Sequence, residues 1–452
     1  MRLFPGALHI STYDVRGTLA ATGVARTVRE TGLVNHTHQL LRALAVRHPD
    51  TRIALTRTGA AGPEPVSELR TPQGQLAQLR SIATRFPQYL SGPGGGKSDV
   101  LVRRYYEDEI DEPDNPVWGS LAGQYAAAVL DAGIPDLLLQ NTNPVVAVLK
   151  ALESGRLEAS ALGGLAATGV VHDTAGYGRR FQYIAEQLRA GAPLRLIAVS
   201  QAVARGLRQA GVPADRLTVV PNGMDTTAFR DLLDRVRKAA VFERVRERNG
   251  VPRAARIMLV SARRVRWKGA QDVVEAAALL AERGRIRDAV VVVNGAGMLD
   301  SRDTGYQDEL ARLVRDRNLE HAVFLLDELS PDEVAACYSA AHIAVHPSRE
   351  PEPWGYANME AMLAGVPVIA AGHGGPLEYI RDGVSGLLVP PRDPDALAHT
   401  LDAVLSDGEL HARLGAAGRA SAQRFTLEAM FTGYEAVLGA GLATRAQTAG
   451  AR

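Results

Sequence analysis

The chain has 452 residues and a mass of 48.2 kDa, about three times the usual length of one domain, which favours two domains and excludes a single small binding module. Hydrophobic residues make up 46% of the chain and charged residues 22%, so wholesale disorder is excluded. The 51 basic and 50 acidic side chains leave a net charge of +1. This balance gives no general electrostatic reason to bind nucleic acid or an anionic membrane.

The sequence contains no run of 18 apolar residues and no secretory signal pattern. We therefore expect a cytoplasmic protein without a transmembrane segment. The single cysteine, Cys337, excludes an internal disulfide and a cysteine-rich zinc site, and its apolar surroundings predict a buried, inert thiol. Only four of the 51 basic residues are lysines, so a lysine in a chemically suggestive place needs an explanation.

Short apolar runs alternate with segments of helical period, which predicts parallel strands joined by helical crossovers. The first set of predicted strands covers residues 7–11, 52–56, 136–139, 167–171, 194–199 and 217–220. The second set covers residues 257–260, 289–293, 322–326, 343–346, 366–370 and 386–389. The pattern predicts an α/β fold with two Rossmann-like, doubly wound domains that face each other across a central cleft.

We expect the first domain over residues 1–225, a connector over 226–252 and the second domain over 253–425. Residues 426–452 are expected to form a C-terminal helix followed by a frayed tail. A return of this helix to the first domain is considered. The stretch 59–117 is less regular and is interpreted as a variable excursion of the first domain. Charges of both signs interleave in the connector, so a solvated helical face is favoured there over a nucleic-acid patch.

The densest group of suggestive residues is His346–Met362. Glu352 is placed on the loop after a strand, and a helix is expected to start near Gly355 and to carry Glu360. Two separated carboxylates in this arrangement suit the binding of two hydroxyl-bearing parts of one ligand.

The loop after the predicted strand 366–370 is rich in glycine. Gly374 and Gly375 let the backbone approach a ligand, and Pro376 suits the first turn of a helix. The N-terminus of such a helix would favour an anion such as a phosphate group.

A third loop, residues 261–269, follows the first strand of the second domain and concentrates cations. Lys268 stands there with Arg263, Arg264 and Arg266. Such a group at a strand end fits either a pyrophosphate clamp or a solvated basic turn.

Together these loops resemble the retaining glycosyltransferases of family 4, also called group 1, which have the GT-B architecture. The similarity covers most of the second domain and the domain junction. The matching segments are Ala262–Gly269, Glu352–Gly355, Glu360–Met362, Gly365–Ile369, Gly374–Gly375 with Glu378, Asp382–Pro390, Val199–Ser200, and Val219–Asp225 with Phe229.

The resemblance implies that Arg263 and Lys268 bind the diphosphate of a sugar donor. It implies that Glu352 binds hydroxyls of the transferred sugar and Glu360 the nucleotide ribose. His172 matches the strand-end histidine that the family places beside the donor sugar, so the predicted catalytic residues are His172, Lys268, Arg263 and Glu352. The remaining implied donor contacts are Gly23, Trp354, Gly355, Tyr356, Gly374, Gly375, Pro376 and Leu377.

The first domain departs from the family pattern. Its glycine loop is Ala21-Thr-Gly-Val24, so that only Gly23 carries over. The candidate acceptor contacts are Thr12, Asp14, Arg16 and His172. His36 and His38 are also considered, but simple surface or satisfied histidines are favoured.

The sequence therefore predicts a retaining, metal-independent glycosyltransferase of the hexosyltransferase type. No Asp-x-Asp motif stands at a predicted strand end, and we expect no cofactor besides the substrate, a sugar linked to UDP, GDP or ADP. The expected acceptor is a small polar molecule, such as a cyclitol or a precursor of a bacterial specialised metabolite.

The sequence leaves several alternatives open. They are a nucleotide-sugar epimerase, a glycan phosphorylase, a non-catalytic sugar-nucleotide-binding protein and a transferase with a membrane-lipid acceptor. No nucleic-acid partner is expected, and assembly of several copies is left open.

Overall fold

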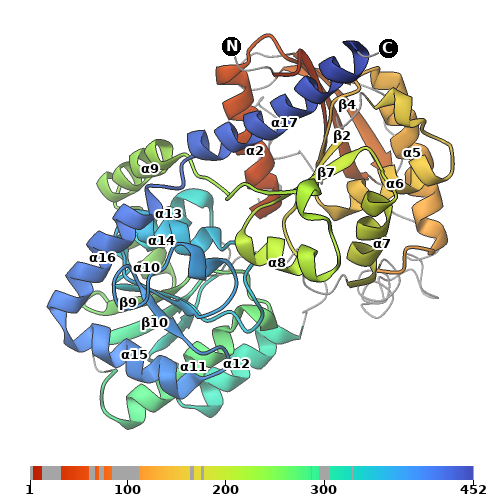
Figure 1. Cartoon of the computed structure of the whole chain (residues 1–452). Coiled ribbons are helices and arrows are strands. Elements are labelled where there is room, and N and C mark those ends of the chain that lie inside the picture. Colours follow the sequence, from red (N-terminus) through yellow and green to blue (C-terminus); the bar gives the residue numbers. More distant parts are fainter. Residues whose placement is uncertain are drawn as a thin grey trace. The chain divides into compact units, whose positions relative to one another are not determined.

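The computed structural model describes residues 4–12, 32–60, 67–70, 76–83, 111–162, 167–174, 178–286, 288–294, 305–327 and 329–450. The chain divides into two compact units (Figure 1). The first contains Met1–Gly223 and Leu427–Arg452, and the second contains Met224–Thr426. Each unit is an α/β domain built on one sheet, as the alternating apolar runs and helical segments predict.

The first unit is built on an eight-stranded sheet in the order β3-β4-β2-β1-β5-β6-β7-β8. The strands pair in parallel, except that β3 and β4 are antiparallel. The strands are β1 (Ala7–Thr12), β2 (Arg52–Ala60), β3 (Ser67–Arg70), β4 (Leu76–Ala83), β5 (Leu137–Gln140), β6 (Ala167–Val171), β7 (Leu194–Ala198) and β8 (Leu217–Val219). The helices are α2 (Gly32–Arg47), α5 (Pro116–Ala132), α6 (Thr142–Glu153), α7 (Gly178–Arg189), α8 (Gln201–Gln209) and α17 (Leu427–Gly450), with 3-10 turns at Ala159–Ala161 and Ala214–Arg216.

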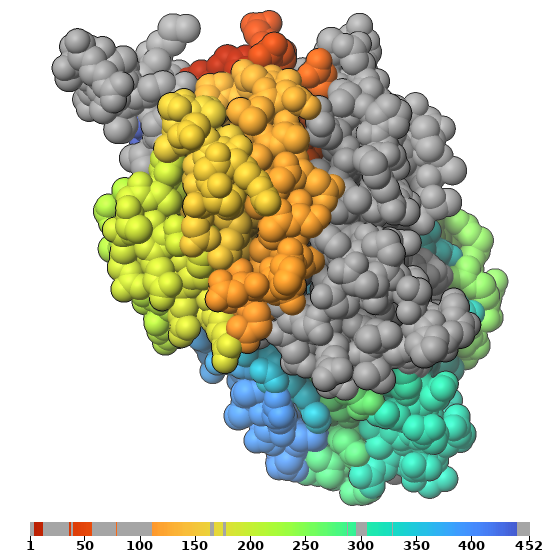
Figure 2. All heavy atoms as spheres, turned by 90° about the vertical axis from the view of Figure 1, so that its right-hand side faces the viewer, coloured from red at the N-terminus to blue at the C-terminus, as the bar shows by residue number. Residues whose placement is uncertain are grey.

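The central strands of this sheet are continuous apolar runs because they are buried. Every residue of β5 and β6 is buried. Helix α6 packs on these strands between α5 and α7, and the three helices form the orange, yellow and yellow-green surface in Figure 2. Gly169 of β6 permits this packing, since a Cβ there would lie 2.5 Å from the side chain of Val145 on α6.

The stretch 59–117 adds structure to the first sheet that the sequence did not predict. Strand β2 continues to Ala60, and β3 and β4 extend the sheet beyond it. Within the described part, the expected excursion is therefore a sheet edge followed by the start of α5.

The second unit is built on a six-stranded parallel sheet in the order β11-β10-β9-β12-β13-β14. The strands are β9 (Arg256–Val260), β10 (Ala289–Val293), β11 (Val323–Leu325), β12 (Ile343–His346), β13 (Val368–Ala371) and β14 (Leu387–Val389). The helices are α9 (Thr226–Lys238), α10 (Val241–Arg248), α11 (Ala270–Glu282), α12 (Tyr306–Asp316), α13 (Pro331–Ala340), α14 (Tyr356–Ala364), α15 (Pro394–Ser406) and α16 (Gly408–Ala422), with 3-10 turns η4 (Arg266–Lys268) and η6 (Gly375–Glu378).

Residues 226–252, expected to be a separate connector, form α9 and α10 and belong to the second unit. Apolar side chains on both helices, including Val236 and Val245, are buried in the hydrophobic core that contains β9 and α13. Most of the basic residues of this stretch are exposed, whereas Arg246 is buried and donates to the carbonyl oxygen of Arg253. A basic exterior over an apolar interior is typical of a helix that packs on a domain.

The C-terminal helix α17 belongs to the first unit. It packs on α2, and Met430, Phe431 and Tyr434 are buried in the first unit's core. Arg47 of α2 donates two hydrogen bonds to the buried Glu435 carboxylate, at 3.0 and 2.7 Å. The helix continues to Gly450, so most of the expected frayed tail is helical.

None of the helices in the described residues is both long enough and apolar enough to cross a bilayer. Cys337 is buried, as expected, and burial raises the pKa of its thiol to about 12. The thiol is therefore protonated at neutral pH and is a poor nucleophile.

Candidate active site

The strand order of the second unit locates its expected ligand site. The chain moves outward from β9 through β10 to β11, and then from β12 through β13 to β14 on the other side. Open α/β sheets bind ligands beyond the carboxyl ends of the strands at such a switch point. The loop after β9 carries Arg263 and Lys268, and the loop after β12 carries Glu352. Two of the three loops singled out in the sequence therefore meet where the topology favours a ligand.

Arg349 connects the loop after β12 to the loop after β9 and to helix α11. Its guanidinium donates to both carboxylate oxygens of the buried Asp272 on α11, at 2.9 and 2.6 Å. Its backbone N–H donates to the carbonyl oxygen of Trp267 at 2.6 Å. Between them, Gly269 has a φ of 79°, and a Cβ there would lie 2.1 Å from the carbonyl oxygen of Pro347. Only glycine permits this approach of the two loops.

Lys268 and Glu352 form an ion pair with a hydrogen bond from Nζ to Oε2. Ser348 donates from Oγ to the same carboxylate oxygen at 3.2 Å. Burial opposes the charge on Glu352, but the Lys268 cation and the two hydrogen bonds outweigh it, so the pKa of Glu352 lies below its ordinary value. The site thus contains a charged carboxylate and a cation whose side chains are only 13% and 16% exposed.

The third loop, after β13, lies against Glu352. Residues Glu352 and Gly374 form a parallel bridge, and the N–H of Gly375 donates to the carbonyl oxygen of Glu352 at 2.7 Å. Gly374 has a φ of 71°, and a Cβ there would lie 2.3 Å from that carbonyl oxygen. The structure therefore brings together Lys268, Glu352 and the glycine turn.

The helix expected after Gly375 is a single 3-10 turn, η6, and not an α-helix. Its few peptide units cannot sum to the dipole that the sequence analysis expected to hold an anion. Pro376 has no N–H, and the N–H of Gly375 is used within the protein. Leu377 is 48% exposed, but its N–H occupies the third position of the 3-10 turn, where it faces the carbonyl oxygen of Gly374. The predicted donor contact of Leu377 therefore stays a prediction.

The side chain of Trp354 lies inside the second unit's core. Its ring is 2% exposed and packs edge to face on Tyr379 and Phe425, with centroids 5.2 and 5.1 Å away. Its carbonyl oxygen accepts a hydrogen bond from the Tyr379 hydroxyl at 2.6 Å. The Trp354 ring therefore anchors the loop on the core, and the predicted contact of Trp354 with the donor stays a prediction.

Glu360 lies on α14, which begins after Gly355, a residue with a φ of 93°. Burial raises the pKa of the Glu360 carboxyl to about 7, and the Tyr338 hydroxyl opposes this shift in part. Tyr356 lies in the first turn of the same helix, and burial together with the Glu360 charge raises the pKa of its hydroxyl. The Glu360 carboxyl thus lies near the hydroxyls of the buried Tyr338 and the partly buried Tyr356, and it can exchange hydrogen bonds with ligand hydroxyls.

The four cations after β9 do not form one cluster. Arg264 donates to the carbonyl oxygen of Asn294 at 3.2 Å and to Gln307 at 2.7 Å, and Arg266 pairs with Glu309 on α12. Both arginines therefore bind residues of neighbouring segments, Asn294 after β10 and Gln307 and Glu309 on α12. Lys268 reaches Glu352, and Arg263, partly exposed, lies in the same loop.

In the first unit, His172 directly follows β6, and Gln140 ends the neighbouring β5. Nε2 of His172 lies 3.1 Å from Oε1 of Gln140. The His172 ring meets the His36 ring edge to face, with centroids 4.6 Å apart at 77°. His36 is fully buried on α2, and its Nε2 lies 3.1 Å from the hydroxyl of Tyr434 on α17.

Burial keeps both imidazoles neutral. It lowers the pKa of His36 to about 3, with a Gln140 hydrogen bond opposing the shift. Burial and the neighbouring His36 lower the pKa of His172 well below its ordinary value. His36 was expected to be a surface or satisfied histidine, and its contact with His172 is a feature that sequence reasoning missed.

Three further predicted residues, Gly23, Asp14 and Arg16, lie outside the described residues, as do the side chains of Thr12 and His38. Thr12 is the last residue of β1. No group of three His, Cys, Asp or Glu side chains that could hold a metal ion occurs in the described segments.

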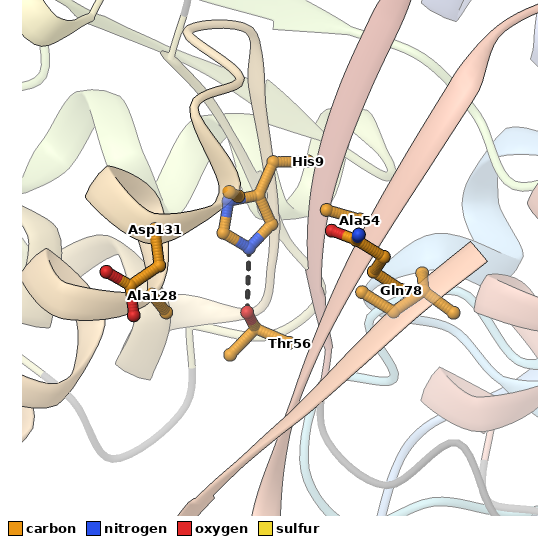
Figure 3. A pocket seen from close by; sticks show the side chains of 8 residues that line it. His9, Ala54, Thr56, Gln78, Ala128 and Asp131 are labelled. Atoms are coloured by element: carbon orange, nitrogen blue, oxygen red, sulfur yellow. Dashed lines mark hydrogen bonds between the residues drawn. The ribbon is translucent and has the colours of Figure 1, made fainter. Parts of the chain in front are cut away.

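One pocket of the first unit contains none of the predicted site residues (Figure 3). Its lining residues are His9, Ala54, Leu55, Thr56, Gln78, Ala128, Asp131 and Ala132. His9 and Thr56 are 2.7 Å apart, from Nε2 to Oγ1. His9 pairs in register with Leu137, the first residue of β5, so the pocket lies toward the amino ends of the strands. Open α/β sheets bind ligands at the opposite ends.

Two family models match the chain and together cover most of both units. The model described as "Glycosyl transferases group 1" matches residues 241–421, and "Glycosyltransferase Family 4" matches residues 31–228. The chain belongs to the family 4, or group 1, glycosyltransferases. The resemblance stated from the sequence motifs is confirmed.

Similarity to named glycosyltransferases covers part of the chain. A "D-inositol 3-phosphate glycosyltransferase" of Corynebacterium efficiens is 33% identical over 218 residues, which are 48% of this chain and 49% of that protein. The protein with the same name in Xylanimonas cellulosilytica is 33% identical over 243 residues, 54% of this chain and 56% of its own length. The chain spans about half the length of the curated relatives it matches.

Several solved structures share the fold over nearly the whole chain. The Anabaena protein HepE, solved in complex with UDP and glucose, is 18% identical and covers 96% of this chain and 99% of its own, with a TM-score of 0.66. Sucrose-phosphate synthase of Thermosynechococcus elongatus is 21% identical and covers 98% of this chain and 100% of its own, with a TM-score of 0.69. The predicted GT-B class, with two Rossmann-like domains, is confirmed.

Proposed function

We propose that this glycosyltransferase moves a sugar from a nucleoside-diphosphate sugar to a small polar acceptor, with retention of anomeric configuration and without a metal ion. The observation that carries the proposal is the Lys268–Glu352 ion pair at the switch point of the second sheet. A diphosphate arriving beside Lys268 replaces the carboxylate as its anionic partner. Glu352 is then available to accept hydrogen bonds from sugar hydroxyls.

The chemical step in this proposal is the departure of a diphosphate from the anomeric carbon. Negative charge grows on the leaving phosphate oxygen, and fixed cations and N–H groups that face it lower the barrier. Lys268 and Arg263 supply the cationic charge, and the amide of Gly374 supplies an N–H group. The protein's own groups thereby perform the charge stabilisation for which other transferases use a metal.

Retention is proposed because neither glutamate is placed as a nucleophile. Glu352 is held by Lys268 and Ser348, and Glu360 is assigned to hydroxyls of the nucleotide ribose. The acceptor oxygen attacks the face from which the diphosphate leaves. The bond between the anomeric carbon and the phosphate oxygen breaks as the new glycosidic bond forms, and the acceptor proton passes to that phosphate oxygen. His172 is assigned to orienting the donor sugar.

The acceptor proposal rests on composition and on the relatives. A net charge of +1 offers no general attraction to an anionic membrane surface. Two curated relatives, each aligned with this chain over about half of its own length, are named for D-inositol 3-phosphate, a small phosphorylated cyclitol. We therefore favour a cyclitol or a similar polyol as acceptor.

The test begins with thermal stabilisation of the full chain by UDP, GDP and ADP, since a ligand at 100 times its Kd adds about 2.7 kcal/mol of stability. The matching α-linked sugar nucleotide is then incubated with inositol 3-phosphate and with uncharged cyclitols, with and without EDTA. Proton NMR reads the anomeric configuration of the product. An α-linked product that forms equally well with and without EDTA supports the proposal. A β-linked product would overturn retention, and loss of activity in EDTA would overturn metal independence.

Two lysines offer a matched comparison. Lys268→Ala is expected to lower kcat/KM at least 100-fold, the size of effect that loss of one charge-stabilising group has in other enzymes. Lys238→Ala removes an exposed lysine on α9 and is expected to retain wild-type activity. Near-normal turnover by Lys268→Ala would show that the diphosphate clamp is wrongly assigned.

A further inference from the structure

The neighbours of His172 form a chain of side-chain contacts that begins on the C-terminal helix. The Tyr434 hydroxyl on α17 contacts Nε2 of His36 on α2 at 3.1 Å, and the edge-to-face contact joins His36 to His172. Gln140 holds His172 from the neighbouring strand end at 3.1 Å. Tyr434 and His36 are both fully buried, and Gln140 is too.

This arrangement fixes the protonation pattern as well as the orientation of His172. An amide oxygen can only accept a hydrogen bond, so the contact with Oε1 of Gln140 requires the proton of His172 on Nε2. Nδ1 then carries the lone pair and can accept a hydrogen bond from a ligand hydroxyl. The edge-to-face contact with His36 restricts rotation of the His172 ring.

Simple core packing would not require these residue types. A buried polar group costs free energy unless it is hydrogen-bonded, and an apolar ring would fill the position of His36 without that cost. Tyr434 is likewise surrounded by the apolar residues of α17 and the first core, where phenylalanine would pack equally well. The polar contacts therefore point to a task beyond filling space.

We propose that His36 and Tyr434 are positioning residues, through which the C-terminal helix holds His172, whose tautomer is set by Gln140, in one orientation toward the donor sugar. The inference rests on the proposed function, because it takes His172 as the residue that orients the sugar. Neither His36 nor Tyr434 is proposed to touch the substrate.

A double-mutant cycle tests whether Tyr434 acts through His172. We expect Tyr434→Phe to lower kcat about 3- to 10-fold, the value of one hydrogen bond, with little change in the KM of the donor. In a His172→Ala background the same substitution should change kcat less than twofold. Equal losses in both backgrounds would mean that Tyr434 affects the enzyme in some other way, and the inference would be overturned.

Histidine NMR tests the same coupling without any substrate. The full chain, labelled with ¹⁵N-histidine, is compared with Tyr434→Phe, with His36→Phe and with His172→Ala, which assigns the His172 signals. The wild-type chain should show one neutral His172 tautomer with the proton on Nε2, and the first two variants should shift or broaden these signals. Unchanged His172 signals in both variants would refute the positioning role.

The control is Tyr183→Phe on α7, which removes another buried hydroxyl, 3.3 Å from Glu153. It should leave kcat and the His172 signals unchanged. Failure of the wild-type chain to bind or turn over sugar nucleotides would overturn the proposed function. The NMR comparison would still decide whether Tyr434 and His36 hold His172.

Discussion

Glu360 makes the stability of the second unit depend on pH in a direction that can be stated in advance. Because the folded protein raises the pKa of this carboxyl to about 7, the folded state holds the proton more tightly than the unfolded chain does. Below the unfolded-state pKa of about 4.5, the tighter proton binding by the folded state contributes fully to the free energy of unfolding. This contribution is lost as the pH rises through the folded-state pKa of about 7. Glu360→Gln removes this ionisation and should stabilise the protein at alkaline pH.

The magnitude follows from the shift. Raising the pKa from 4.5 to about 7 corresponds to about 3 kcal/mol at pH 8, at 1.36 kcal/mol per pKa unit. At pH 5 the folded state is still protonated and the unfolded chain only partly ionised, so the difference should be below about 1 kcal/mol. The stabilisation by Glu360→Gln should therefore grow roughly threefold or more between pH 5 and pH 8.

Urea unfolding of the full chain at both pH values measures these differences, with a separate transition fitted for each unit. Glu320→Gln, at an exposed position of the same unit, is the control and should shift neither transition by more than about 0.5 kcal/mol. A stabilisation by Glu360→Gln that is the same at pH 5 and pH 8 would refute the reasoning. If the proposed ribose contact is correct, the variant should also lose most of the thermal stabilisation that the preferred nucleotide gives to the wild type.

The remaining predictions concern the loops around the Lys268–Glu352 pair. Gly374→Ala forces a positive φ on alanine and drives its Cβ into the carbonyl oxygen of Glu352, so we expect a loss of about 2–3 kcal/mol in urea unfolding. A loss below about 0.5 kcal/mol would contradict the described turn. Arg349→Ala leaves the buried Asp272 carboxylate without its bidentate partner and should cost about 3 kcal/mol. Arg392→Ala breaks a pair whose side chains are both at least half exposed and should cost less than about 1 kcal/mol; equal costs for the two arginine variants would show that burial does not govern them.

The sequence predicts the sheets well because parallel strands that are buried on both faces consist of short runs of apolar residues. Each strand expected in the second unit is present, with bounds that differ by up to two residues. The strand at Leu76–Ala83 was missed because it has neither a continuous apolar run nor strict alternation, and it lies in a stretch interrupted by glycine and proline. Its place in the sheet is set by pairing with β2, which local sequence does not encode.

The candidate site is predicted in part for a similar reason. Lys268, Glu352 and Gly374 stand at strand ends, and parallel strands bring their carboxyl ends to one edge. The 3-10 turn after Gly374 was missed because glycine followed by proline suits the start of either kind of helix. The contact between His36 and Tyr434 joins residues 398 positions apart, so a local sequence pattern cannot predict it.

The return of α17 to the first unit has a consequence for biosynthesis. The second unit is one uninterrupted stretch, Met224–Thr426, whereas the first needs Leu427 and the residues beyond it to complete its core. At about 5–20 residues per second, a ribosome takes roughly 10–40 seconds to make the intervening stretch. During that interval the apolar surface later covered by Phe431 and Tyr434 is open to water or to chaperones. The part of the chain made first is therefore the part that finishes folding last.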